Sequence, residues 1–305
     1  MHTSDMELTL GPVLFEWKRD EILRFYDEVA RMPVDRVYVG EVVCTKKKAL
    51  TINDIGRVAA MLEQAGKKVV LSSLAVVSNE EELNAVRELA LLPFDIEAND
   101  MSVFNIIEGR NKTVFAGPHI TSYNAPTIDF LKSLGVKRVV FPVELSGESI
   151  AYNIKHTGMA SEVFAHGKAP LAFSWRCYTS RAFGLTKGEC RRDCVKYPDG
   201  LELRSLEGEP VFTINGTSLL SAAVYTLIEH VDAMREKGVA ALRISPQYKD
   251  TARIADVWRK RIDKEISIED SVKELGRTSQ SGFCNGWYSG MAGKDYISCL
   301  QALNL

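Results

Sequence analysis

The sequence predicts a single (β/α)8 barrel of the TIM type, which is an α/β fold. Eight short runs of β-forming residues alternate along the chain with stretches whose apolar residues recur at helical spacing. The chain has 305 residues, enough for one barrel domain. An open, doubly wound sheet is the alternative. No G-x-G-x-x-G sequence follows the first predicted strand, so the main signature of a dinucleotide-binding sheet is missing.

The predicted strands are short and rich in the apolar residues that suit a sheet buried on both faces. The first reads ELTLGPV and the second RVYVGEVV. The seventh has an apolar continuation that reaches Phe173. In order, the predicted strands cover residues 7–13, 36–43, 68–74, 94–97, 113–116, 137–143, 161–165 and 239–244.

The amphipathic stretches between these strands predict the outer helices of the barrel. Gly135 gives a stop signal at the end of one of them. The stretch 218–237 is predicted as the longest helix of the chain. The predicted helices cover residues 18–31, 52–65, 80–91, 126–134, 148–156, 218–237 and 251–264, with a short additional helix over 268–275.

Two segments lie outside this alternation, and we interpret both as additions to one domain that spans residues 1–305. Two β-type runs flank Glu207-Gly208-Glu209, which predicts a small hairpin insertion at about 200–214. A Gly-rich C-terminal tail covers residues 281–293.

The composition is that of a soluble globular protein with balanced charge. Forty acidic and 38 basic residues give a net charge of -2, whereas dedicated nucleic-acid-binding proteins usually carry a basic excess. The first ten residues lack the apolar core of a secretion signal, and no apolar run approaches the roughly 18 residues that span a bilayer. We therefore expect a cytoplasmic protein that is not integral to a membrane. In a reducing compartment, cysteines serve as ligands, reactive thiols or core residues rather than in disulfides.

The segment 162–194 concentrates the residues with distinctive chemistry. Cys177, Cys190 and Cys194 follow a C-x12-C-x3-C spacing on a polar stretch rich in Gly, Arg and Lys. An isolated cysteine is usually buried as a small apolar residue, but such a stretch has little apolar surface in which to bury one. Three thiols gathered there indicate a cysteine-rich loop that holds a metal or cluster, with a fourth ligand from elsewhere in the chain.

The predicted barrel suggests where the fourth ligand comes from. Active sites of TIM barrels lie at the C-terminal ends of the strands. Cys44 follows the second strand in the way that Cys177 follows the seventh, so both are expected on the same face. Cys284, in the Gly-rich tail, is the competing fourth ligand. Cys299 is interpreted as a thiol on a helix face or in the core.

Four thiolates suit either a tetrahedral zinc ion or an iron–sulfur cluster. Structural zinc sites usually pair two close knuckles of the C-x2-C kind. Here only Cys190 and Cys194 are close in sequence. This distribution favours a [4Fe-4S] cluster.

Other polar residues at predicted strand ends could take part in catalysis, although each could equally have a structural role. His119 and His166 could act as acid or base, and Glu97, Asp100 and Glu144 also lie at strand ends. Carboxylates are common at such positions, so no catalytic residue is predicted. The sequence contains neither a G-x-S-x-G elbow nor an H-E-x-x-H motif.

Several of these residues together resemble the signature of the collagenase-like peptidase family of unknown catalytic type. Most members of that family carry a further cysteine seven residues before the cysteine of the S-x-R-C motif, where this sequence has Pro170. Cys44 is placed to replace that ligand. The matching residues are Glu162-Val163-Phe164, His166-Gly167, Ala172-Phe173-Ser174, Arg176-Cys177 and Cys190-x3-Cys194.

A subgroup of this family that serves ubiquinone biosynthesis is similar to this sequence in three features. These are the early cysteine Cys44, the run Cys284-Asn285-Gly286-Trp287 and residues 290–296. The resemblance runs over essentially the whole chain. It implies a [4Fe-4S] protein that forms a heterodimer with a paralogue. It also implies oxygen-independent hydroxylation of ubiquinone precursors, with prephenate as the hydroxyl donor and a lipid-binding accessory protein. Proteolysis is not expected, because no nucleophile or hydrolytic metal site is recognisable. The cluster ligands that this resemblance implies are Cys44, Cys177, Cys190 and Cys194.

Two rival functions stay open. One is an RNA-base hydroxylase, since relatives in the same family hydroxylate tRNA or rRNA bases. The mildly acidic charge and the replacement of a loop cysteine by Pro170 argue against it. The other is a non-catalytic subunit that holds a cluster while its paralogue binds the substrate.

Overall fold

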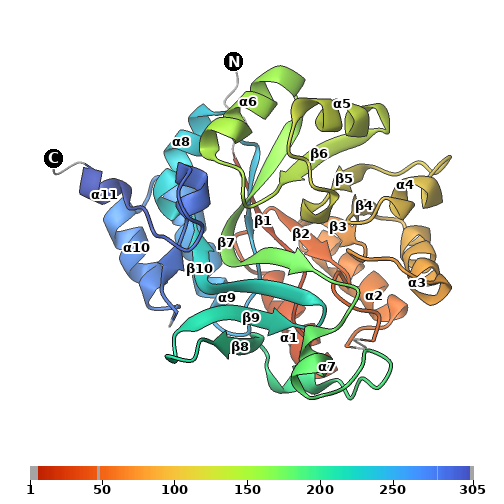
Figure 1. Cartoon of the computed structure of the whole chain (residues 1–305). Helices are drawn as coiled ribbons and strands as arrows, with labels where there is room; N and C mark the ends of the chain where they lie inside the picture. The colour runs from red at the N-terminus through yellow and green to blue at the C-terminus, as the bar shows by residue number, and fades with distance from the viewer. Residues whose placement is uncertain (1–5, 47–48, 280, 303–305) are drawn as a thin grey trace.

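The computed structural model describes residues 6–46, 49–279 and 281–302. It confirms the predicted TIM-type barrel, because eight parallel strands close into a ring (Figure 1). Strands β1 to β7 pair in sequence order, and β11 pairs with both β7 and β1. This closure is incompatible with an open doubly wound sheet. Among the described residues, no helix is long and apolar enough to cross a membrane.

The barrel strands are short, as their apolar runs predict, and most of their residues are buried. Only β7 is long, since it runs on past the barrel. The barrel strands are β1 (Glu7–Leu10), β2 (Arg36–Val39), β3 (Lys68–Ser72), β4 (Asp95–Ala98), β5 (Val114–Ala116), β6 (Val136–Phe141), β7 (Ala160–Phe173) and β11 (Ala241–Ile244).

Helices follow most of the strands and cover the outside of the ring (Figure 1). The side chains of Thr51, Asn79, Asn124, Ser146 and Ser267 each accept a hydrogen bond from the first turn of the helix they precede, which fixes its start. The helices are α1 (Arg19–Val29), α2 (Ile52–Gln64), α3 (Glu80–Leu91), α4 (Ser102–Ile106), α5 (Ala125–Ser133), α6 (Gly147–Thr157), α7 (Tyr178–Ala182), α8 (Val231–Glu236), α9 (Thr251–Ile262), α10 (Ile268–Gly276) and α11 (Cys299–Ala302).

The predicted helix over 218–237 is wrong for its first half. Residues Ser218–Thr226 form strand β10, and only α8 at the end of the stretch is α-helical. The reason is tertiary, because β10 pairs with β7 on one side and with β9 on the other. The sequence prediction also misses α4, a five-residue helix too short to show helical periodicity.

An antiparallel extension, made of residues 166–173 of β7 with β10, β9 (Pro210–Asn215) and β8 (Leu201–Arg204), continues the sheet beyond the barrel. Figure 1 shows these strands side by side, with α7 next to them. In the tail, β12 (Phe283–Cys284) pairs with the far end of β10.

The turn between β9 and β10 lies against the loops that follow the first two barrel strands. Asn215 Nδ2 donates to the carbonyl of Leu14 at 2.7 Å, and Thr217 Oγ1 donates to the carbonyl of Val43 at 2.8 Å. The antiparallel extension therefore rests on the C-terminal end of the barrel, which is where active sites of this fold lie.

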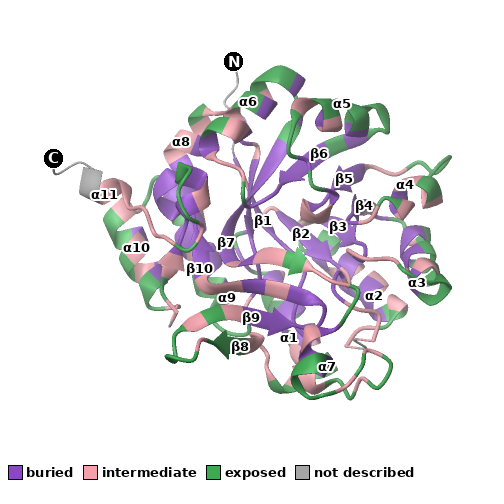
Figure 2. Ribbon diagram, in the orientation of Figure 1, coloured by how far each residue is buried: buried purple, intermediate pink, exposed green. Residues whose placement is uncertain are grey.

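The apolar core fills the space between the strands and the helices, so the inner layers of the molecule are buried in Figure 2. Trp258 of α9 is its largest fully buried side chain. The antiparallel extension and α7 are less covered, and β8 is mostly exposed.

Candidate functional site

Cys177 lies at the junction of β7 and α7, where the chain leaves the barrel. It is the residue before α7 begins, and its side chain is 8% exposed. The backbone N–H of Ser180 donates a hydrogen bond to its Sγ at 3.3 Å.

Cys190 and Cys194 lie on either side of Arg192, in the more exposed part of the same segment. Arg192 adopts a left-handed backbone conformation with φ of 58°. Its N–H donates to Cys190 Sγ at 3.3 Å. Its guanidinium pairs with buried Glu16, which raises the pKa of Arg192, and the Cys194 and Cys190 thiols add to this effect. A fixed positive charge therefore stands beside both thiols.

Cys44 follows β2 and is held by its own loop. Glu41 Oε1 accepts hydrogen bonds from the backbone N–H groups of Val43 at 2.8 Å and Cys44 at 3.0 Å. The Cys44 side chain packs against a small apolar cluster formed by Leu14, Val42 and Val43. Phe173, four residues before Cys177, packs on the same cluster.

The β9–β10 turn joins the loop of Cys44 to the segment of Cys177. Val43 accepts the hydrogen bond of Thr217, and the carbonyl of Gly216 accepts one from the N–H of Tyr178 at 2.7 Å. Two residues after Cys44, Lys46 Nζ donates a hydrogen bond to the carbonyl of Lys187 at 2.7 Å. The structure thus brings the chain around Cys44 into contact with the 177–194 segment, across more than a hundred residues of sequence.

The four predicted ligands would suit a metal cluster by the chemistry of their thiols. Cysteine thiolates are the ligands of iron–sulfur clusters and of structural zinc, and backbone N–H groups already point at two of the sulfurs. In the described part of the chain, no three His, Cys, Asp or Glu side chains form a closed metal-binding group. The ligand set Cys44, Cys177, Cys190 and Cys194 therefore stays a prediction.

The two remaining cysteines lie elsewhere in the fold. Cys284 is buried in β12, and burial raises the pKa of its thiol to about 11. It pairs with Tyr225 near the end of β10, whereas the chain next to Cys177 bonds to Gly216, in the turn before β10 begins. Cys299 Sγ lies 3.6 Å from His230 Nδ1, beside α8.

Charged side chains fill the middle of the barrel and pair with one another. Arg243 of β11 contacts two buried carboxylates, Glu162 Oε1 at 2.6 Å and Glu97 Oε1 at 2.7 Å. Tyr38 donates to Glu162 Oε2 at 2.7 Å, and Ser72 donates to Glu97 Oε2 at 2.7 Å. Burial raises the pKa of Glu162, but the charges of Arg243 and Arg138 and the hydrogen bond from Thr9 together lower it below its usual value, so that carboxyl is ionised at neutral pH.

Sequence reasoning missed Arg243 as a site residue, although its signal is present. Arg243, Glu162 and Arg138 each stand next to apolar residues in a predicted strand. A charge in a strand buried on both faces must meet an opposite charge. This pattern could have identified the barrel network.

Two cavities meet at the C-terminal mouth of the barrel. The inner cavity lies over Arg243 and Glu97, and the outer one opens beside β6 and residues 170–173 of β7. His119, Pro118 and Pro170 line both cavities and so form the wall between them.

His119 faces this mouth with its ring nitrogens unused. Its ring lies 4.2 Å from that of Phe173, and among the described residues neither nitrogen has a hydrogen-bond partner. Burial, aided by the charge of Arg243, lowers the pKa of His119 from 6.5 to about 3. The imidazole is therefore neutral at pH 7 and can either donate or accept a hydrogen bond.

The other predicted polar residues differ in position. His166 is fully buried, its Nδ1 lies 3.2 Å from Thr226 Oγ1, and it lines neither cavity. Asp100 Oδ1 accepts a hydrogen bond from the N–H of Ser102 at the start of α4, which is a structural role. Glu144 lines the outer cavity.

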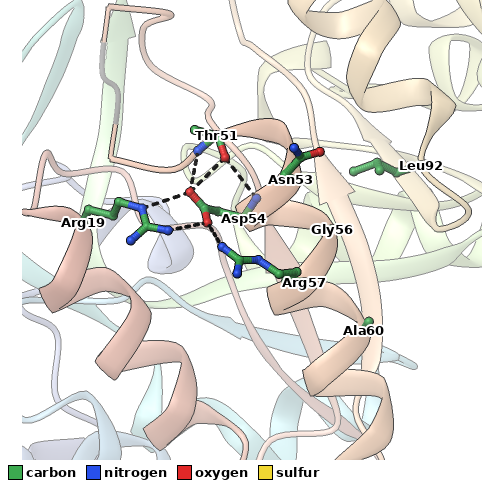
Figure 3. A pocket seen from close by; sticks show the side chains of 8 residues that line it. All are labelled: Arg19, Thr51, Asn53, Asp54, Gly56, Arg57, Ala60 and Leu92. Carbon is green, nitrogen blue, oxygen red and sulfur yellow. Dashed lines mark hydrogen bonds and ion pairs between the residues drawn. The ribbon is translucent and has the colours of Figure 1, made fainter.

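A broad groove between α1, α2 and the end of α3 lies on the outer surface (Figure 3). Asp54 lies at its centre and pairs with Arg19 and Arg57 while it also caps α2 through Thr51. The hydrogen bond from Arg19 lowers the pKa of Asp54. Because these charges satisfy one another, we interpret the groove as structural.

The chain matches Peptidase family U32 over residues 24–298. The "tRNA hydroxylation protein P" of Helicobacter pylori is 29% identical over 174 residues, which cover 50% of this chain and 40% of that protein. The "tRNA hydroxylation protein P1" of Bacillus subtilis is 29% identical over 188 residues, which cover 56% of this chain and 44% of that protein. The chain therefore matches less than half of the length of these relatives.

Among solved structures, the chain is similar in fold to thiamine phosphate pyrophosphorylase from Pyrococcus furiosus. The TM-score is 0.47 at 7% sequence identity, over 87% of this chain and 99% of that one.

Proposed function

The chain belongs to Peptidase family U32, and from this premise we propose that it is the iron–sulfur subunit of an oxygen-independent hydroxylase for ubiquinone precursors, of the UbiV type. The relatives named tRNA hydroxylation proteins support a hydroxylase-related role rather than proteolysis. The quinone precursor as substrate rests on the resemblance of the cysteine pattern and the C-terminal tail to UbiV.

One observation carries the cluster assignment. The β9–β10 turn bonds both to Val43, next to Cys44, and to Tyr178, next to Cys177. A cysteine from the second strand is thereby held beside the segment that contains the other three. This arrangement supports Cys44 as the replacement for the loop cysteine that Pro170 removes.

The proposed ligands of the [4Fe-4S] cluster are Cys44, Cys177, Cys190 and Cys194. A bound cluster would supply one-electron redox chemistry. The N–H groups of Ser180 and Arg192 would stabilise the thiolates of Cys177 and Cys190. The guanidinium of Arg192 would offset part of the negative charge of the ligand set.

A UbiU-like paralogue is the proposed partner, in a one-to-one heterodimer, with a lipid-binding accessory protein that presents the substrate. Prephenate is the proposed hydroxyl donor. Co-expression with the paralogue should yield a one-to-one complex in size-exclusion chromatography. A chain that stays monomeric beside its paralogue and is active alone would contradict the heterodimer.

An RNA-base hydroxylase is the second candidate, and the relatives named tRNA hydroxylation proteins favour it directly. A third reading is a subunit that holds the cluster but does not bind substrate. Activity of each subunit alone and of the mixed pair would separate this reading from a catalytic role.

A strain that lacks the gene separates the two substrates. It is grown with and without oxygen, and both its quinone and its hydroxylated tRNA bases are measured. We expect a quinone defect under anoxia only, with tRNA unchanged. A tRNA defect with normal quinone would establish the RNA alternative, and a quinone defect confined to aerobic growth would reject the proposal.

A further inference from the structure

The outer cavity at the barrel mouth has the size and the walls of a site for a single ring. Its volume is ≈ 230 Å³. An apolar cavity of about 150 Å³ is large enough for benzene. Most of its lining residues are apolar, among them Ala75, Pro170, Ala172 and Phe173, and the polar ones include His119 and Glu144.

The inner cavity is too small to receive a ring. Its volume is ≈ 30 Å³, which is the space of about two water molecules. Only a polar substituent could reach past His119 toward Asn99. The Oδ1 atom of Asn99 is buried in this cavity without a hydrogen-bond partner among the described residues. A ring in the outer cavity would therefore direct a polar group inward.

The charges around the outer cavity disfavour an anionic ligand. Its lining contains no Lys or Arg, and Glu144 contributes a carboxylate. The nearest buried cation, Arg243, is already paired with Glu97 and Glu162. A carboxylate or phosphate entering here would lose part of its hydration and meet no free positive charge.

His119 supplies the polar end of the site. Its neutral ring is oriented by Phe173 and has both nitrogens available. A hydroxyl or amide group on the ligand would form a hydrogen bond with a ring nitrogen of His119. This bond is favourable because the partly buried imidazole otherwise lacks one.

The outer cavity also adjoins the cysteine region. Ala75 and Phe173 line it and pack on the apolar cluster of Leu14, Val42 and Val43 that Cys44 contacts. A ring bound there would lie one layer of side chains away from Cys44.

We propose that the outer cavity binds a planar, uncharged ring with a hydroxyl or amide group, and that His119 is the positioning residue that hydrogen-bonds this group. The class of ligand in this inference rests on the proposed hydroxylase function. A phenolic quinone precursor and a nucleobase share this chemistry.

The test is binding of phenol, uridine and benzoate to the anaerobically purified protein, measured by saturation-transfer NMR and titration. Phenol represents a quinone precursor, uridine a nucleobase, and benzoate a ring of the same size with a negative charge. His119→Phe keeps the aromatic packing but removes both nitrogens. Ala172→Phe fills the cavity from an exposed position, and His156→Phe on the surface of α6 is the matched control.

We expect phenol to bind better than benzoate, His119→Phe to weaken phenol binding about tenfold, and Ala172→Phe to abolish it. Stronger binding of uridine than of phenol would identify a nucleobase as the ring. Benzoate binding at least as tight as that of phenol, or equal phenol binding by wild type and both cavity variants, would overturn the inference. Because the readout is binding and not turnover, failure here leaves the proposed function intact, and a negative strain test leaves this site intact.

Discussion

The barrel interior and the cysteine segment that follows β7 are built in opposite ways. In the interior, Arg243, Glu97 and Glu162 are almost fully buried and satisfy one another. In the cysteine segment, no residue from 181 to 200 is buried, and backbone N–H groups donate to the sulfurs of Cys177 and Cys190. The difference teaches that stability resides in the closed ring, whereas the proposed cofactor chemistry resides in a segment with little apolar cover.

The largest expected effect on stability is in the interior. Arg243→Met leaves Glu97 and Glu162 buried without their cation, which should lower the free energy of unfolding by about 3–5 kcal/mol. The measurement is urea unfolding followed by circular dichroism. Arg253→Met, which removes a surface pair with Glu274, is the control and should change it by less than about 1 kcal/mol. Equal effects of the two variants would refute the proposed division between the regions.

In the cysteine segment we expect loss of the cofactor without loss of the fold. Cys44→Ala and Cys177→Ala should each abolish iron binding in anaerobically purified protein, while their circular dichroism stays that of the wild type. Cys299→Ala, outside the region, should retain iron. If Cys284→Ala empties the site and Cys44→Ala does not, the fourth ligand is Cys284 and the tail must reach the barrel mouth.

The barrel should also show a specific acid response through Glu7, at the start of β1. Burial raises the pKa of Glu7, but Lys68, Arg138 and Arg36 outweigh it and lower the pKa from 4.5 to about 2. A depressed folded-state pKa contributes stability above pH 4.5 that disappears as the pH falls toward 2. The stability difference between wild type and Glu7→Gln should therefore shrink over this range. A difference independent of pH would contradict the role of the carboxylate charge.

The smallest expected effect on stability tests the contact between the two regions. Thr217→Val removes the hydrogen bond to Val43 and should lower the free energy of unfolding by about 1–2 kcal/mol. Because this bond holds the loop of Cys44, iron should be lost to a chelator several times faster than in the wild type. Ser221→Ala, in the adjoining strand β10, is the control. Unchanged iron loss would show that the turn does not support the ligand.

Exposure of the cysteine segment predicts sensitivity to oxygen. Cys190 and Cys194 lie among exposed residues, and an accessible cluster is open to attack. The absorbance of the cluster should therefore bleach in air. A cluster that keeps its absorbance for hours in air would indicate cover from a partner or from the tail.

The barrel could be predicted from the sequence because each strand carries its own apolar run. β10 could not, because the apolar residues of 218–226 suit a helix as well as a strand. Its partners β7 and β9 are fixed only by pairing in the fold. This error concealed the turn at Gly216 and Thr217, so the hydrogen bonds that join the loop of Cys44 to the segment of Cys177 were not predicted.

The candidate site was predictable to the same extent. The spacing of Cys177, Cys190 and Cys194 is readable in the chain, and the barrel rule predicts Cys44 on the same face, which stays a prediction. The unused nitrogens of His119 and the pairing of Arg243 depend on side-chain packing between remote strands. No local pattern carries that information.

The central claim is that four thiols from two separate parts of the chain hold one [4Fe-4S] cluster. Its most direct test is iron, sulfide and zinc analysis of the protein purified without oxygen from iron-replete cells. We predict about four iron and four sulfide per chain, as expected for one such cluster. Stoichiometric zinc without sulfide would contradict the claim.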